Sequence, residues 1–144
     1  MGSFAQLFSG MRASSSGLSA ERARIDVISR NIANAQTTSM PDGSGPYRRQ
    51  VVHFAPILQR TAQGRLLATG VRVHHIGDDM STPFEAIHDP SHPDAGPDGT
   101  VYMPNVNTMK EMADLITAMR AYESNLKAQE SFFEMAQQAL RLAR

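Results

Sequence analysis

Helix-breaking residues are confined to the middle of the chain, and this distribution constrains its fold more than any other feature of the sequence. All eight prolines lie between Pro41 and Pro104. Neither proline nor glycine occurs from Leu18 to Met40, and Pro104 is the only helix breaker from Met103 onward. Because proline and glycine disfavour helix interiors, long helices are expected at the two ends and not in the middle.

The C-terminal end carries a heptad repeat that predicts one long helix. One position of the repeat is held by Met112, Met119, Leu126, Phe133 and Leu140. Three residues after each of these come Leu115, Tyr122, Gln129, Ala136 and Ala143. This 3-4 spacing is typical of a helix that buries a narrow seam against another helix. Thr108 and Glu111 have the spacing of a capping box, so Thr108 is expected to be the N-cap residue.

The N-terminal end repeats this period more weakly. Its apolar positions are Phe4, Met11, Leu18, Ile25 and Ile32, with Leu7 and Ile28 three residues after two of them. Ser14–Gly17 is a run of weak helix formers, so a secure helix is expected only over Ser19–Ala35. The first seventeen residues are too short and weakly capped to hold a helix alone, and we expect them to be disordered until something covers them.

Two interpretations of these repeats remain open. In one, the two helices form an intramolecular hairpin and the stripes are its core. In the other, the stripes exceed what one antiparallel pair can cover, and other chains complete the burial. We favour the second, and the predicted assembly seam consists of Leu18, Ile25, Ile28, Ile32, Met112, Leu115, Met119, Tyr122, Leu126, Phe133 and Leu140.

The middle of the chain predicts a small antiparallel β unit. Residues 47–58 and 71–76 are rich in β-branched and aromatic residues, and glycines punctuate the runs. The expected fold class is therefore α+β, with long terminal helices forming a discontinuous, coiled-coil-like assembly domain around a small β-rich insertion. We expect residues 1–40 to be an N-terminal helical segment, residues 41–104 the β and loop domain, and residues 105–144 the C-terminal helix packed on the first.

Charge and composition exclude several classes of protein. Lys+Arg and Asp+Glu are 14 each, so no net charge directs the chain to nucleic acid. The absence of cysteine excludes disulfides and thiol chemistry, and no apolar run is long enough to insert directly into a membrane. The charges are nevertheless unevenly distributed along the chain. Residues 43–77 contain five arginines and no acidic residue, and residues 73–109 contain six acidic residues and neither lysine nor arginine. These runs indicate either a solvated face or a head-to-tail contact between copies.

One cluster could carry chemistry. His88, Asp89, His92 and Asp94 place two imidazoles and two carboxylates within seven residues. The spacing matches no established helical metal site, and no second cluster supplies further ligands. We therefore expect no catalytic residue, no metal and no cofactor, and keep a metal-dependent enzyme built on this loop as the alternative from another class.

Three segments of the chain resemble the axial family of the bacterial flagellum, whose members build the rod and the hook. The first runs from Ser16 to Thr38, the second from Gly45 to Phe54, and the third from Asp89 to Asn107. The third is most similar to a subunit of the proximal rod, although another rod or hook subunit remains an alternative. The matching motif positions are Asn31, Ala33, Asn34, Asp89, Pro90, His92, Pro93, Asp94, Gly99, Pro104 and Asn105.

The resemblance implies a structural subunit whose terminal helices bundle with those of many copies into the rod tube and help to transmit torque. It implies other copies, neighbouring rod proteins and the flagellar type III export apparatus as partners. It also implies a place in the basal-body rod, where the rod spans the periplasm, reached without a cleaved signal peptide. The loop from Asp89 to Ala95 would be an ordered structural loop leading toward the C-terminal helix.

Overall fold

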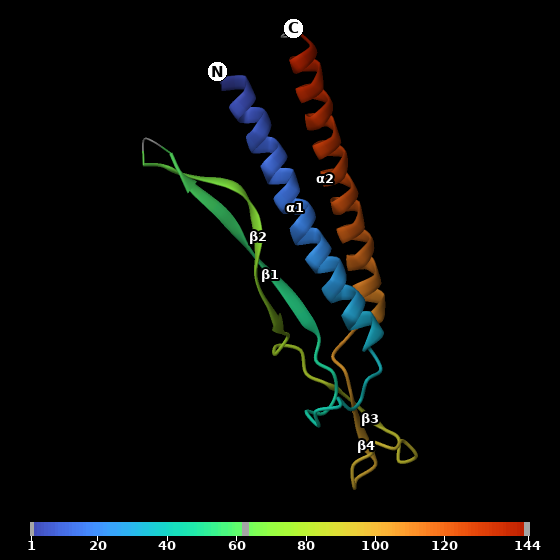
Figure 1. The fold of residues 1–144 in the computed structure, drawn as a ribbon. Helices are drawn as coiled ribbons and strands as arrows, with labels where there is room; N and C mark the ends of the chain where they lie inside the picture. Colours follow the sequence, from blue (N-terminus) through green and yellow to red (C-terminus); the bar gives the residue numbers. More distant parts are fainter. Residues whose placement is uncertain (1, 62–63, 143–144) are drawn as a thin grey trace.

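Two long antiparallel helices form the body of the protein (Figure 1). The structure, a computed structural model, describes residues 2–61 and 64–142, and side chains within residues 8–61 and 64–141. Helix α1 (Gly2–Ala33) and helix α2 (Thr108–Leu142) lie side by side, with both chain ends at the same end of the pair. Two small antiparallel sheets connect them, so the expected α+β class is confirmed.

Helix α1 passes through Ser14–Gly17 without a break, contrary to the expectation that this run would interrupt it. The weak helix formers are packing positions. A Cβ atom on Gly17 would lie 3.0 Å from Asn125 Nδ2, and one on Gly70 would lie 2.5 Å from Ser16 Oγ. Small residues therefore let α1 approach α2 on one side and a β-strand on the other. The disorder expected for the first seventeen residues in a free subunit stays a prediction.

Helix α2 is capped one residue earlier than the sequence indicated. Asn107 Oδ1 accepts a hydrogen bond from the backbone N–H of Lys110 at 3.0 Å, and Asn107 O accepts one from Glu111 N at 2.9 Å. Asn107 is therefore the N-cap residue. The predicted capping box of Thr108 and Glu111 is wrong, because the Glu111 side chain is directed into the interior of the protein.

A long hairpin lies along α1. Strand β1 (Gln50–Arg60) pairs with strand β2 (Leu66–Asp78) in antiparallel register, with irregularities after His53 and Ile57. The predicted antiparallel β unit is confirmed, with longer strands than expected. Both strands contact α1. Among the described helices and strands, α2 contacts only α1. The hairpin therefore covers the side of α1 that faces away from α2 (Figure 1).

A second, short hairpin lies at the opposite end from the chain termini. Strand β3 (Glu85–His88) pairs with strand β4 (Thr100–Met103), and the intervening residues 89–99 form an ordered loop (Figure 1). Gly99 is needed there. Its φ is 71°, and a Cβ atom would lie 2.9 Å from both His88 Cε1 and Pro90 Cγ. These two strands were not predicted, because each is only four residues long.

Candidate functional site

The large apolar side chains of the α2 heptad lie on the outside of the helix pair. We call this surface the outer stripe. Its members and their exposed fractions are Met112 (46%), Met119 (48%), Leu126 (41%), Phe133 (58%) and Leu140 (65%). Met109 and Ile116, at 78% and 54%, extend the same apolar surface. So many large apolar side chains exposed along one helix mark an interaction surface rather than ordinary surface scatter.

A different column of α2 faces α1. It consists of Glu111, Ala118, Asn125 and Phe132, again seven residues apart and each one position before a member of the outer stripe. The facing column of α1 includes two glycines. A Cβ atom on Gly10 would lie 2.6 Å from Phe132 Cζ, and Gly17 meets Asn125 in the same way.

Two polar contacts continue this register toward the other end of the pair. Arg24 Nη2 lies 3.9 Å from Asp114 Oδ1, and Asn31 Nδ2 donates to Glu111 Oε2 at 3.0 Å. The column of α2 that faces α1 thus contains glutamate, alanine, asparagine and one phenylalanine, and the column of large apolar side chains beside it is left exposed.

The rest of the predicted seam is partly covered within the chain. Ile28 is buried. The half-buried members are Leu18, Ile25, Ile32, Leu115 and Tyr122. The predicted residues thus divide into a group that the chain itself covers to a large degree and the five exposed members of the outer stripe. Phe4 and Leu7, which extend the α1 repeat, have side chains outside the described part.

Asn31 is the centre of a buried polar junction between both helices and the β region. Its side chain is 1% exposed. Asn31 Nδ2 donates to Gln50 O at 2.9 Å as well as to Glu111, while Asn31 Oδ1 accepts from Tyr47 Oη and Gln50 N, both at 2.9 Å. Every hydrogen-bonding group of the amide is therefore used, as a buried amide requires. Burial raises the pKa of the Tyr47 hydroxyl, which keeps it neutral as a donor.

Glu111 brings a buried carboxylate into this junction. Its side chain is 1% exposed, and Arg49 Nε donates to Glu111 Oε1 at 2.7 Å. Arg49 Nη1 also lies 3.5 Å from Asp79 Oδ2. Burial acts against the cation, but the hydrogen bond and charge of Glu111 outweigh it and raise the pKa of Arg49. The carboxylate is thus paired, which a buried charge needs to be tolerated.

Asn105 ties the second hairpin region to the same junction. Its Oδ1 accepts from Arg49 N at 2.8 Å, and its Nδ2 donates to the carbonyl oxygens of Asp79 and Thr82 at 3.0 and 2.9 Å. Hydrogen bonds from Ser81 and Thr82 hold the pKa of the Asp79 carboxyl well below its usual range. Segments from four parts of the chain are therefore fixed to one another by side-chain to backbone hydrogen bonds.

The remaining motif positions surround this junction or shape the loop at 89–99. Pro104 is buried, Ala33 is exposed, and Asn34 donates to Arg30 O at 2.9 Å near the end of α1. In the loop, Pro90 packs close to Gly99, while Pro93 is exposed.

The four residues of the metal alternative do not form a shared site. Asp89 Oδ1 accepts hydrogen bonds from Ser91, and Asp94 Oδ2 accepts one from Thr38 Oγ1 at 2.6 Å. His92 Nδ1 accepts one from the backbone of Asp94. Across the described residues, no group of three or more histidine, aspartate or glutamate side chains could hold a metal ion. These groups instead stabilise the turns of the loop.

Sequence reasoning identified Asn31 and Asn105 only through the resemblance, and it missed Tyr47, Arg49 and Glu111. The contact between Asn31 and Glu111 joins residues 80 positions apart, so no local pattern could predict it. The one available signal for the junction was that two charged residues, Arg49 and Glu111, occur in segments that were expected to pack in the protein.

Comparison with known proteins was consistent with the arrangement of the two helices. The family model described as "Flagella basal body rod protein" matches residues 11–39, and "Flagellar basal body rod FlgEFG protein C-terminal" matches residues 98–142. These two segments cover most of α1 and all of β4 and α2. No described helix is long and apolar enough to cross a membrane.

Whole-chain relatives are more specific. The flagellar basal-body rod protein FlgC of Borreliella burgdorferi is 44% identical, over 90% of this chain and 95% of the relative. FlgC of Bacillus subtilis is 38% identical over 95% and 98%, and FlgC of Salmonella typhimurium is 33% identical over 88% and 90%. The exposed helical stripe, the buried asparagine junction and these full-length matches lead to one conclusion: the chain belongs to the FlgC family of flagellar basal-body rod proteins and is a structural subunit of the rod.

Proposed function

We propose that the chain builds the proximal part of the rod by burying the outer stripe of α2 against neighbouring subunits. These neighbours are other copies of the chain and other rod proteins. The observation that carries the proposal is that α1 covers the column of Glu111, Ala118 and Asn125, while the bulky column beside it is left exposed.

The energetics favour such an assembly. Full burial of a large apolar side chain stabilises a complex by about 1.5–3 kcal/mol. The five members of the outer stripe are 41–65% exposed, so each has about half of that value left to gain. Repeated along one helix, this gain is enough to hold a neighbouring subunit against it.

The remaining members of the predicted seam are assigned a supporting role in this proposal. Leu18, Ile25, Ile28 and Ile32 on α1, with Leu115 and Tyr122 on α2, keep the two helices together and present their partly exposed edges to the next subunit. Residues 1–40 and 105–144 then act as one assembly domain, and residues 41–104 as an insertion. The motif residues Asn31 and Asn105 hold that insertion at a fixed angle, since both donate to its backbone.

The proposed role is mechanical and involves no catalytic step. Torque passes between subunits through packed helices, and the buried junction around Asn31 and Glu111 resists bending of the insertion relative to the pair. Side chains on the loop at 89–99 make hydrogen bonds within the loop, as Asp89 does with Ser91, and to the segment after α1, as Asp94 does with Thr38, which supports a structural role for the loop.

We further infer that the subunit reaches the periplasmic part of the rod through the flagellar type III export apparatus and does not insert into a membrane. Export of this kind requires an unfolded or easily unfolded chain. The expected disorder of the first seventeen residues before assembly would serve this step, and circular dichroism of the dilute subunit tests it: full helicity of both ends in a monomer would contradict it.

The substitution Leu126→Asp tests the assembly role of the outer stripe. A carboxylate in the centre of a helix interface should abolish rod formation and motility, while secretion of the protein persists. Leu126 is 41% exposed, so the same change should leave the fold of the free subunit intact. Ile25→Asp on α1 should have the same effect on assembly.

Ser131→Asp is the matched control. Ser131 is exposed and lies five residues after Leu126, about 140° around the helix at 3.6 residues per turn. It adds the same charge away from the outer stripe and should leave motility unchanged. Normal motility of Leu126→Asp, or equal loss of motility in both variants, would refute the proposed interface.

A further inference from the structure

A shallow groove lies between the two helices near the chain termini. We call it the helix groove. It is lined by Met11, Leu126, Gln129, Glu130, Phe133 and Glu134. Its floor is apolar and two carboxylates stand on one edge. Phe133 is 58% exposed, so the apolar floor is open to solvent in the single chain.

The end of the β1–β2 hairpin has the complementary composition. We call the described residues on either side of its turn the hairpin tip: Leu58, Arg60, Arg65, Leu66 and Leu67. The three leucines are 52%, 55% and 42% exposed, in chain order. A long hairpin that ends in exposed leucines is an unusual surface for a protein that acts alone, because such edges pair with other molecules.

The two surfaces also carry opposite charge. The hairpin from His53 to Ile76 contains arginines and no acidic residue. Residues 121–140 of α2, which include the helix groove, contain three glutamates and a single lysine. Within the described residues, neither guanidinium of the hairpin tip and neither carboxylate of the helix groove has a close ion pair. Pairing them across an interface would satisfy both sides.

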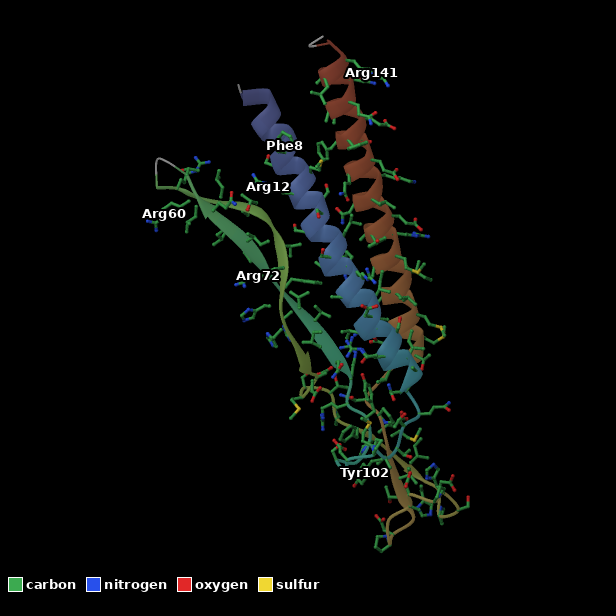
Figure 2. The ribbon with its side chains drawn as sticks, in the orientation of Figure 1. Phe8, Arg12, Arg60, Arg72, Tyr102 and Arg141 are labelled. Atoms are coloured by element: carbon green, nitrogen blue, oxygen red, sulfur yellow. The ribbon has the colours of Figure 1, made fainter. Side chains whose placement is uncertain are left out.

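The contact cannot form within one chain. The hairpin packs on α1 and makes no contact with α2 among the described elements. Figure 2 places Arg60 at the outer end of the hairpin, with α1 between it and α2. The groove on the far side of α1 is therefore open to a hairpin from another molecule only.

The acidic loops at the opposite end of the protein are poorer partners for the hairpin tip. The carboxylates of Asp79, Asp89 and Asp98 already accept hydrogen bonds from serine or threonine hydroxyls, and Asp94 accepts one from Thr38. The carboxylates of these loops are already hydrogen-bonded within the chain, whereas the helix groove has an apolar floor and two carboxylates without an ion pair among the described residues.

We propose that the hairpin tip of one subunit docks into the helix groove of a second copy, with Leu58, Leu66 and Leu67 against Leu126 and Phe133, and Arg60 and Arg65 beside Glu130 and Glu134. Because the two surfaces differ, each subunit both inserts a hairpin and receives one, so the contact runs head to tail from copy to copy in a ring or an open helical array. The inference rests on the proposed assembly into the rod and identifies which surface of the insertion takes part.

The absence of cysteine from the chain makes a crosslinking test direct. Basal bodies from cells that express Leu67→Cys/Phe133→Cys are oxidised mildly and examined for disulfide-linked ladders of this chain. We expect dimers and higher multimers from the double variant, and at most dimers from either single variant. Leu67→Cys/Met109→Cys, with the second cysteine at the far end of α2, and Leu67→Cys/Pro97→Cys, on the acidic loop, are matched controls that should form no ladder.

Charge reversal provides a second measurement in the same assay. Adding Glu130→Arg/Glu134→Arg, or separately Arg60→Glu/Arg65→Glu, to the cysteine pair should reduce the crosslinked fraction about tenfold, since like charges then face each other. Co-expression of the two reversed chains, which restores opposite charges in both directions, should recover the ladder.

Basal bodies that contain the double-cysteine chain but show no ladder would overturn this contact while leaving the proposed function standing. A ladder from the Pro97→Cys control instead of Phe133→Cys would also overturn it and assign the hairpin tip to the acidic loop. Absence of the chain from basal bodies even in the unmodified form would refute the proposed function, and this inference with it.

Discussion

Replacing Asn31 with alanine should be the most damaging single change to the fold that leaves every apolar contact of the seam in place. The side chain is 1% exposed and uses its amide in four hydrogen bonds, to Gln50 N, Gln50 O, Tyr47 Oη and Glu111 Oε2. Asn31→Ala removes all four and supplies no replacement.

The magnitude follows from the groups left behind. A buried polar group without a partner costs about 1–3 kcal/mol. The backbone N–H of Gln50 and the Glu111 carboxylate both lose a neighbour, and the Tyr47 hydroxyl loses its acceptor. We expect a loss of about 3–5 kcal/mol in the free energy of unfolding, the lower end applying if water enters the space. This is a large part of the 5–15 kcal/mol typical of a whole domain.

Urea unfolding followed by far-UV circular dichroism measures this loss. Asn34→Ala is the matched control, since it removes the same side chain in the turn just after α1, where the amide donates to Arg30 O near the surface. That change should cost about 0.5–1.5 kcal/mol. If Asn31→Ala destabilises the chain no more than Asn34→Ala does, the junction does not hold the helices and the insertion together.

Three further predictions address other parts of the structure. Asn107→Ala should destabilise the chain by about 1 kcal/mol and Thr108→Ala by only a few tenths, because Asn107 caps α2; the reverse order in urea unfolding would restore the capping box. Gly70→Ala should cost about 1–3 kcal/mol, because its Cβ atom would lie 2.5 Å from Ser16 Oγ. Gly77→Ala on the same strand should cost less, because its Cβ atom would lie no nearer than 3.3 Å to the His75 ring; equal thermal shifts would contradict this close approach of Gly70. The lowered pKa of Asp79 contributes stability to the fold that is present above pH 3.8, the usual aspartate value, and is lost as the pH falls below it. Asp79→Asn should therefore make the free energy of unfolding depend less on pH at the acid end. An unchanged acid slope would rule out this contribution.

The sequence predicted the period of the helices better than it predicted their facing sides. The columns that begin at Glu111 and Met112 both repeat every seven residues, so the period is the same for each. The column covered by α1 contains Ala118 and Asn125, which carry little apolar signal, while the prominent methionines and leucines lie outside. A pattern of hydrophobicity could therefore identify a helix with an apolar stripe but not which surface would cover the stripe.

The long hairpin was predictable for a similar local reason, and the junction was not. Val51–Phe54 and Val71–Val73 carry the β-branched residues of paired strands, and glycine marks the turn between them. Strands β3 and β4 are joined by a loop whose geometry depends on Gly99 and on the hydrogen bond from Asp89 N to Gly99 O, which is a contact across the loop rather than a repeat. The same applies to Arg49 and Glu111, which are 62 positions apart and meet only when the β region folds against the start of α2.

The uneven distribution of contacts along the helix pair gives it graded elasticity. At one end, the hydrogen-bonded amide of Asn31 and the carboxylate of Glu111 fix the separation of α1 and α2; at the other, Gly10 meets the apolar ring of Phe132. A force that separates the two helices would therefore be resisted more strongly at the end that carries Asn31 and Glu111 than at the end that carries Gly10 and Phe132. A subunit built in this way can keep its insertion at a fixed angle while the ends of α1 and α2 near the chain termini shift by small amounts to fit neighbours that are not identical. Strain from a change of neighbour would then be relieved within each subunit and would not accumulate along the rod.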